Sequence, residues 1–480
     1  MSKPRGLTPL QQSSRSIALR FIGLLTGLAT QSLVVRGLGP LAYGQFGLLS
    51  SNLQIAGQLA DVGAEQNSIR VLGAKPQDKY IALRALFTLR LATAVIVVLV
   101  VIGIVAIARL PSTMQRASLL AALVVPVSAL GASRAVLVAQ GESHRVQAGL
   151  LVQALVNLAM VAAITFVSQL TLSWAVASLV IATVVNGAMY AWWTHGIGWR
   201  NPIDLRGATQ LARTSLPLGL AAGCAAIAFR IPTTIILASL GTVAAGFFHA
   251  IYRWIDFAQI LPQNVMLSLF PGLVNLRLNS STGRNRYAEM TSGLIASGLW
   301  LTVAIAAGGG IAARLMYGPT FDQAAQIAPI LGWGLPAVFV SYAHGNTLIA
   351  QGRYTTQLRV TVVSLLGTLV YYTVLTRTLG LPGTVIATLL TEYSAACTGA
   401  YLVWRTLRLE PPWRRTLAKT ALPLALGLGA MALNLGPIVG SAIALAAVAG
   451  SALTLRHTLA ELPHETVGAA VPADAFASDT

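Results

Sequence analysis

Apolar residues gather along the chain in long runs that are separated by short polar stretches. A run of about 20 apolar residues forms an α-helix long enough to cross the roughly 30 Å hydrocarbon core of a bilayer. The pattern therefore predicts an all-α, polytopic membrane protein with about 14 transmembrane helices. The expected spans cover residues 17–35, 44–63, 88–108, 117–139, 148–168, 173–193, 214–237, 243–267, 291–313, 325–349, 359–377, 383–405, 417–434 and 437–455.

The distribution of Lys and Arg predicts how these spans are oriented. With the N-terminus in the cytoplasm and alternating spans, the inner loops and span ends hold 25 of the 32 Lys and Arg residues. The outer loops then hold five, and two lie within spans. Because cytoplasmic loops retain positive charge, this bias favours fourteen spans with both termini in the cytoplasm.

The amino-acid composition argues against a soluble protein and against a nucleic-acid partner. Only 10% of the residues are charged and 55% are hydrophobic, whereas soluble proteins average roughly 25% charged residues. The net charge of +18 is explained by the inner loops, where basic residues meet anionic headgroups, so no nucleic-acid partner is expected. Cys224 and Cys397 both fall in apolar spans. We therefore expect no disulfide, no metal site and no cofactor.

Two short motifs recur in equivalent places of the two halves. Residues 38–46 read LGPLAYGQF and residues 240–248 read LGTVAAGFF, with five of nine positions identical. Residues 137–141 read LVAQG and residues 348–352 read LIAQG. Glycine permits a tight turn where two helices meet at the membrane face, which suffices to explain the motifs. Their placement also predicts a duplicated architecture with a substrate site between two lobes.

The stretch VRGLGPLAYGQFGL at 35–48, followed by LADVG at 59–63, resembles the first hairpin of bacterial polysaccharide-unit flippases. These belong to the multidrug/oligosaccharidyl-lipid/polysaccharide (MOP) exporter superfamily. The resemblance implies a flippase of the bacterial inner membrane that moves an undecaprenyl-diphosphate-linked oligosaccharide by alternating access, for surface polysaccharide biosynthesis. A cavity lined with cationic side chains, contact with membrane lipid and a coupling proton or sodium ion would accompany that function.

The same layout predicts four segments. They are an N-lobe at 1–205, a C-lobe at 206–412, a terminal helix pair at 413–456 and a disordered cytoplasmic tail at 457–480.

Ionisable residues inside the predicted spans are the candidate substrate site, because a charge at mid-span costs about 2.5–3.5 kcal/mol. Arg230 and Arg253 are predicted to face a wet cavity and bind the substrate diphosphate, since arginine bonds phosphate through two parallel N–H groups. An alternative is that Arg253 only pairs with Asp256, three residues later. Arg20 and Arg134 form the cytoplasmic mouth of the cavity, or else snorkel to the headgroups.

Three acids are candidates for ion coupling: Asp61, Asp256 and Glu392. Local helix or loop contacts would also explain Asp61.

Two other functions remain open. An ion-coupled drug or small-molecule antiporter would share the fold, but it would need cavity acids without cavity arginines. A membrane-embedded polymerase or glycosyltransferase would need a catalytic carboxylate set outside the bilayer. The outer loops contain almost no acids apart from Asp322, so we expect a transporter rather than an enzyme.

Overall fold

The computed structural model describes residues 9–74, 79–107, 111–194, 203–274, 280–433 and 436–461. These residues are almost entirely helical and contain no β-strand, which confirms the predicted all-α class. The chain forms two compact units, Met1–Leu237 (unit 1) and Ala238–Thr480 (unit 2).

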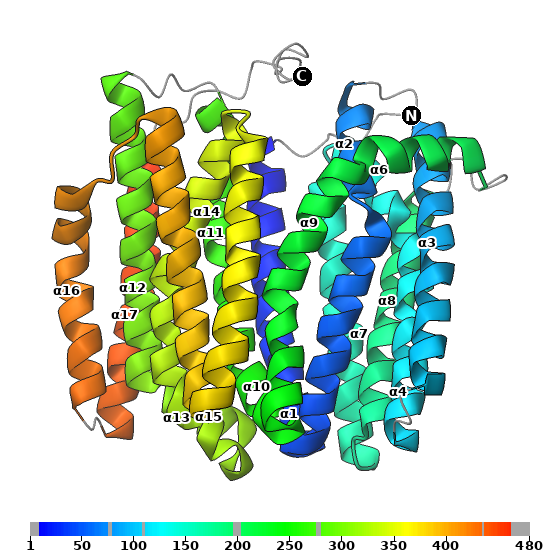
Figure 1. Ribbon diagram of the computed structural model, residues 1–480, viewed down its shortest axis with the longest axis horizontal. Helices are drawn as coiled ribbons and strands as arrows, with labels where there is room; N and C mark the ends of the chain where they lie inside the picture. Colours follow the sequence, from blue (N-terminus) through cyan, green and yellow to red (C-terminus); the bar gives the residue numbers. More distant parts are fainter. Residues whose placement is uncertain are drawn as a thin grey trace. The chain divides into compact units, whose positions relative to one another are not determined.

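The helices of unit 1 are drawn in blue to green in Figure 1. They are α1 (Pro9–Asp61), α2 (Ala64–Ala74), α3 (Lys79–Ile107), α4 (Ser112–Ala122), α5 (Val124–Ser128), the 3₁₀ helix η2 (Ala129–Ala132), α6 (Ser133–Ala139), α7 (Ser143–Val167), α8 (Leu172–Trp193) and α9 (Leu205–Leu240), whose last turn passes into unit 2.

Unit 2 continues with helices drawn in green to red. They are α10 (Thr242–Ala258), α11 (Ile260–Val274), α12 (Ser281–Tyr317), η3 (Pro319–Phe321), α13 (Asp322–Leu331), η4 (Gly332–Gly334), α14 (Leu335–Ala350), α15 (Tyr354–Leu407), α16 (Trp413–Ala432) and α17 (Pro437–Glu461). The predicted tail begins inside α17, and residues 462–480 lie outside the described residues.

Helices α1 and α15 each contain two of the predicted spans. A straight helix of 54 residues, the length of α15, would be about 80 Å long, far more than a bilayer needs. Each helix is instead broken by a glycine with positive φ, at 69° for Gly39 and 66° for Gly380. Figure 1 shows α15 as two rods that meet at a sharp bend.

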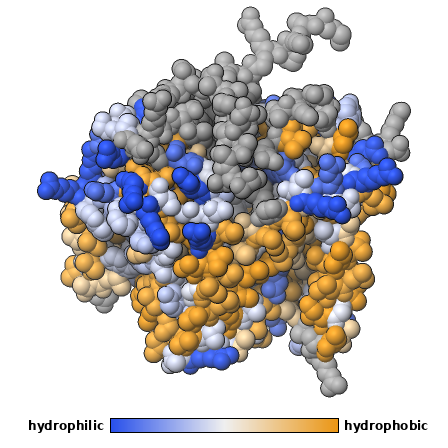
Figure 2. All heavy atoms as spheres, turned by 45° about the horizontal axis from the view of Figure 1, so that its top comes forward, coloured by the Kyte–Doolittle hydropathy of each residue, from blue (hydrophilic) through white to orange (hydrophobic). Residues whose placement is uncertain are grey.

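The outer faces of the helices are suited to lipid. Among the described residues, ten helices are long and apolar enough to cross a membrane. Large apolar side chains such as Ile96, Leu99 and Phe166 are exposed on them, and Figure 2 shows broad hydrophobic areas on the face drawn there. The chain is a multi-pass membrane protein. The count of fourteen spans stays a prediction, since α10, α11 and α16 fall outside the ten.

The repeated motifs do form turns, as the sequence predicts. Gly39 and Gly241 have φ of 69° and 84°, and Gly141 and Gly352 have φ of 76° and 72°. Residues with a side chain rarely adopt a positive φ, so each of the four positions favours glycine.

The two units also share interruptions that the sequence pattern did not predict. A 3₁₀ segment interrupts the fourth predicted span of each half, η2 in unit 1 and η4 in unit 2. A second break also occurs in both units: it separates α1 from α2 at the end of the predicted span 44–63, and it separates α10 from α11 within the predicted span 243–267. The duplication therefore extends beyond the two motifs to the shape of individual helices.

Helix α9 packs against the end of α1 and against α2. Asn67 donates hydrogen bonds to Thr214 and Ser215, at 3.0 and 2.9 Å, and Ser51 bonds Thr233 at 3.4 Å. The sequence assigned α9 to the C-lobe, whereas most of it falls in unit 1. The lobe boundaries stay a prediction.

Candidate functional site: a polar cavity in unit 1

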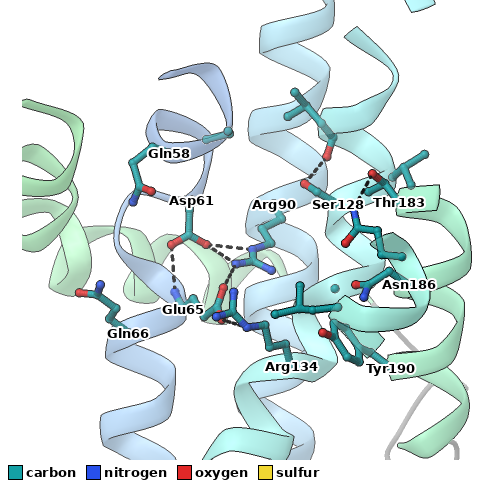
Figure 3. Close-up of a pocket in the computed structure, with 18 of the residues that line it drawn as sticks. Gln58, Asp61, Glu65, Gln66, Arg90, Ser128, Arg134, Thr183, Asn186 and Tyr190 are labelled. Atoms are coloured by element: carbon teal, nitrogen blue, oxygen red, sulfur yellow. Dashed lines mark hydrogen bonds and ion pairs between the residues drawn. The ribbon is translucent and has the colours of Figure 1, made fainter. Parts of the chain in front are cut away.

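Unit 1 contains a cavity of about 500 Å³. Its walls come from the end of α1, from α2 and α3, from the α5–η2–α6 segment, and from α7 and α8 (Figure 3). The polar side chains that line it are Gln58, Asp61, Glu65, Gln66, Arg90, Ser128, Arg134, Gln153, Thr183, Asn186 and Tyr190.

The break between α1 and α2 places two acids at this cavity. Asp61 ends α1, and one of its oxygens, Oδ2, accepts a hydrogen bond from the backbone N–H of Glu65 in α2, at 3.3 Å. The two residues between the helices, Val62 and Gly63, have φ of 51° and 70°. This conformation is unusual for a β-branched residue and costs of order 1–3 kcal/mol, so the surrounding structure must hold Val62 in place.

A buried arginine connects the two acids. Arg90 on α3 donates to Asp61 Oδ1 through Nε at 2.9 Å and through Nη2 at 2.6 Å. The same Nη2 donates to Glu65 Oε2, also at 2.6 Å. The side chains of all three residues are at most 16% exposed. Charge-assisted hydrogen bonds of this kind are about twice as strong as neutral ones, so the cluster fixes α3 to the α1–α2 break.

A second arginine extends the cluster into the cavity. Arg134 on α6 lies 3.4 Å from Glu65 Oε1 through its Nε, and its side chain is 46% exposed. Two positive and two negative charges therefore lie together, and each carboxylate is shared or paired (Figure 3). We call Asp61, Glu65, Arg90 and Arg134 the charge cluster.

Several hydrogen-bond donors at the cavity have no acceptor among the described residues. Nη1 of Arg90 and both Nη atoms of Arg134 make no hydrogen bond with the described residues. Nδ2 of Asn186, on the α8 wall, is buried and likewise has no partner there. Of these groups Asn186 Nδ2 is a buried donor, and buried donors are rarely left unpaired. Together with the arginine donors at the same cavity it points to an anionic or carbonyl-bearing ligand.

An apolar core supports the cavity. Leu86 and Leu89 on α3 pack with Leu72 on α2 and with Val136 on α6, all of them buried. Because Arg90 and Arg134 lie next to these residues on the same helices, packing fixes the backbone positions from which both side chains extend toward the cavity.

Of the residues predicted from sequence, the structure brings Asp61 and Arg134 together. They lie at one cavity and are joined through Glu65 and Arg90. Arg20 on α1 and Arg230 on α9 are half-buried in unit 1 but do not line this cavity.

The other three predicted residues lie in unit 2. Arg253 and Asp256 form the ion pair that their spacing allows, at 3.2 Å on α10, and Arg253 remains 33% exposed. Glu392 on α15 is 9% exposed and makes no hydrogen bond or ion pair with the described residues. The roles predicted for these residues stay predictions.

Sequence reasoning missed Glu65 and Arg90. The charge distribution places Arg90 among the basic residues of the inner loops and span ends, although Arg90 lies within an apolar run. Its position within an apolar run is the feature that could have identified it, because a charge inside a membrane span needs a partner. Glu65 gave a weaker signal, as the residue four positions after Asp61.

The fold is that of MOP-superfamily transporters. The structure of "Lipid II flippase MurJ, inward closed conformation" matches with a TM-score of 0.68 and 12% identity, over 93% of this chain and 98% of that chain. An inward-facing multidrug resistance MATE family transporter matches with a TM-score of 0.65 and 15% identity, over 82% and 98%. A MOP-superfamily transporter from Pyrococcus furiosus matches with a TM-score of 0.58 and 16% identity, over 85% and 99%.

No family model and no curated protein matches the chain. At these identities the structural likeness establishes the fold, and the function is inferred from the site.

Proposed function

We propose that the protein is a flippase that carries a lipid-diphosphate-linked oligosaccharide across the bacterial inner membrane by alternating access. The observation that supports this most directly is the charge cluster, in which Arg90 and Arg134 hold unused N–H donors at a polar cavity. The likeness to a lipid II flippase over nearly the whole chain agrees with a lipid-linked substrate.

The geometry suggests the order in which a phosphate meets the two arginines. Arg134 is 46% exposed and has one contact at 3.4 Å, so its guanidinium moves at little cost. Arg90 is 12% exposed and holds both acids, so it is reached second. Arginine offers paired donors that match phosphate oxygens, which suits it to both steps.

Binding of phosphate competes with Asp61 and Glu65 for these donors. Two arginines and two carboxylates are neutral together, and a diphosphate adds at least two negative charges. An excess of charge next to side chains as buried as those of Asp61, Glu65 and Arg90 is costly. Uptake of protons or of a metal cation by the released carboxylates would restore neutrality. Asp61 and Glu65 are in this way proposed to couple an ion to the substrate.

The remaining predicted residues keep their proposed roles. Arg20, Arg230 and Arg253 are proposed as further contacts for the substrate, and Asp256 and Glu392 as further groups for ion coupling. The lipid carrier is proposed to be undecaprenyl diphosphate.

The test uses purified protein in liposomes with a fluorescent polyprenyl-diphosphate oligosaccharide. Flipping is followed by the accessibility of the label to a reagent that does not cross the membrane. We expect Arg134→Gln to slow flipping by about 10- to 100-fold, the loss of one or two charge-assisted hydrogen bonds. The matched control is Arg145→Gln, because Arg145 is 40% exposed and also pairs with a glutamate, Glu142, outside the cavity.

Equal flipping by wild type and Arg134→Gln, at equal amounts of folded protein, would overturn the assignment of the cavity. Equal slowing by Arg134→Gln and Arg145→Gln would do the same.

A second function is supported by Glu392, a buried acid without a hydrogen bond among the described residues. Such a group suits an ion-coupled antiporter of cationic compounds, and the MATE transporters share the fold. The same liposomes separate the two functions. Uptake of a cationic dye that depends on Glu392, without movement of the lipid-linked substrate, would favour the antiporter.

A further inference from the structure

A second pocket lies within unit 2, at the end where α12 and α16 begin and α15 terminates. Its volume is about 490 Å³, and its lining includes Arg284, Arg408, Arg414 and Arg415, with Glu410 as the one acid. The lining therefore has a net charge of +3. A concave surface with charge of one sign concentrates ions of the opposite sign.

Two of these arginines are available to a ligand. Arg408 and Arg414 are exposed, and their side chains make no hydrogen bond or ion pair with the described residues. Arg415 has a different role, since it donates from Nη2 to Asn285 Oδ1 at 3.0 Å and from Nη1 to the Asn285 carbonyl at 3.3 Å. This contact joins α12 to α16 and gives the pocket a fixed wall.

The backbone adds to the positive potential of the pocket. Helix α16 begins at Trp413, and its N-cap residue, Pro412, provides no side-chain cap. The N–H of Trp413 donates to the carbonyl of Pro411 at 2.9 Å. The N–H groups of Arg414 and Arg415 have no acceptor among the described residues and lie at the positive end of the helix dipole. These groups favour an anion at the same place as the arginines.

Exposed aromatic and apolar residues lie at the pocket and on the helices that lead away from it, and Trp413 is itself part of the lining. Trp413 and Leu417 of α16 are 71% and 65% exposed, and Tyr401 of α15 is 51% exposed. The ring of Tyr401 lies near that of Trp404, with centroids 6.1 Å apart and the planes tilted by 40°. Exposed tyrosine and tryptophan are typical of the boundary between headgroups and acyl chains.

We propose that this pocket binds the headgroup of an anionic phospholipid from the surrounding membrane. The phosphate contacts Arg408, Arg414 and the beginning of α16, while the acyl chains lie along the exposed apolar side chains of α15 and α16. A soluble phosphate would use the arginines but would make no contact with the adjoining apolar surface. Basic pockets between membrane helices are known to select anionic lipids on these grounds. The proposal does not depend on the transported substrate.

The experiment measures lipid binding to the delipidated full-length protein in detergent, by native mass spectrometry. Phosphatidylglycerol is compared with phosphatidylcholine and with inorganic phosphate. We expect the double variant Arg408→Asn/Arg414→Gln to bind phosphatidylglycerol about 30-fold more weakly, at roughly fivefold for each charge. Asparagine is chosen at position 408 because φ is 55° there, a conformation that asparagine tolerates.

The control double variant is Arg353→Gln/Arg359→Gln. These arginines are exposed near the beginning of α15, outside the pocket, and their removal changes the net charge equally. Binding should change little in the control. Glu410→Gln should strengthen binding by about fivefold, because it removes the one negative charge of the lining. This gain is measurable even if the arginine double variant folds poorly.

Three results would overturn the proposal. One is equal binding of phosphatidylcholine and phosphatidylglycerol, which would mean that the charge of the headgroup does not contribute to binding. Another is equal loss of binding in the two double variants, which would mean a general surface effect. The third is displacement of phosphatidylglycerol by inorganic phosphate at a similar concentration, which would identify a site for a soluble anion.

Discussion

Arg90 is the residue that holds the unit 1 cavity in its present shape. It bonds Asp61 and Glu65 together while being 12% exposed. Without it, Asp61 would lie next to Glu65 with no positive charge of its own, and Glu65 would keep only its 3.4 Å contact with Arg134. Removing one partner from a buried ion pair costs about 3–5 kcal/mol, whereas exposed pairs contribute about 0–1 kcal/mol.

We therefore expect Arg90→Met to lower the free energy of unfolding by about 3–5 kcal/mol. Thermal unfolding of the purified protein in detergent measures the effect. Arg145→Met, which breaks the more exposed pair with Glu142, should change stability by less than about 1 kcal/mol. Similar shifts in the two variants would contradict the central position of Arg90.

At this scale the sequence identified the presence of the charges but not their partners. Asp61 and Arg134 stand out because they interrupt or flank apolar runs. The sequence does not show that these residues are connected. Arg90 is 29 residues from Asp61 and contacts it only because α3 packs on the α1–α2 break. Contacts this distant in the chain depend on tertiary structure and leave no local pattern.

At the scale of elements, two contacts between helices rest on single glycines. A Cβ at Gly219 of α9 would overlap the backbone carbonyl group of Val62. Helix α9 therefore packs directly against the left-handed Val62, the residue that follows Asp61.

Gly219→Ala should separate α9 from the α1–α2 break and disturb both stability and transport. Backbone atoms give way less readily than flexible side chains, so we expect a loss of about 1–3 kcal/mol. Gly23→Ala is the control, because no atom lies within 4 Å of a Cβ at that site. Thermal unfolding and the flipping assay measure both variants, and an unchanged Gly219→Ala protein would argue against the contact.

Helices α17 and α16 each contain a glycine whose replacement by alanine should change stability, and the two changes should have opposite signs. A Cβ at Gly440 would lie 2.6 Å from the carbonyl oxygen of Ala307 on α12, whereas nothing lies within 4 Å of one at Gly429 on α16. Gly440→Ala should lower stability by about 1–3 kcal/mol through overpacking. Gly429→Ala should raise it by about 0.5–1 kcal/mol, because alanine favours the helix. Thermal unfolding that shifts in the same direction in both variants would refute this packing of α17 on α12.

Helices and their turns were more predictable than the interruptions within them. Apolar runs gave the positions of the helices, and the repeated glycines gave turns that the structure confirms at Gly39, Gly141, Gly241 and Gly352. The interruptions at η2 and η4 fall inside predicted spans, whereas the break at Val62 coincides with the predicted end of the span 44–63. These interruptions arise where packing against neighbouring helices overrides the local preference of the sequence for a continuous helix. The sequence of one helix alone does not reveal such packing.

At the scale of the whole molecule, the two units repeat the same pattern of kinks and turns while their polar residues differ. Unit 1 has the charge cluster in a cavity, whereas unit 2 has the Arg253–Asp256 pair and the buried Glu392. Duplication preserved the framework that glycines and packing require, and the two copies diverged at charged positions. A transporter built in this way can divide substrate binding and ion coupling between its halves.

The orientation of that framework in the membrane is the prediction on which the direction of transport depends. The positive-inside bias places the turn before α7 in the cytoplasm and the turn before α8 outside. Single cysteines at Ser143 and Ser168, in a protein whose Cys224 and Cys397 are replaced by serine, test this directly. In intact cells an impermeant maleimide should label the cysteine at position 168, and it should label the one at position 143 only after the membrane is opened. The reverse pattern would place the basic loops outside, and the arginine-lined pocket of unit 2 would then face the other leaflet.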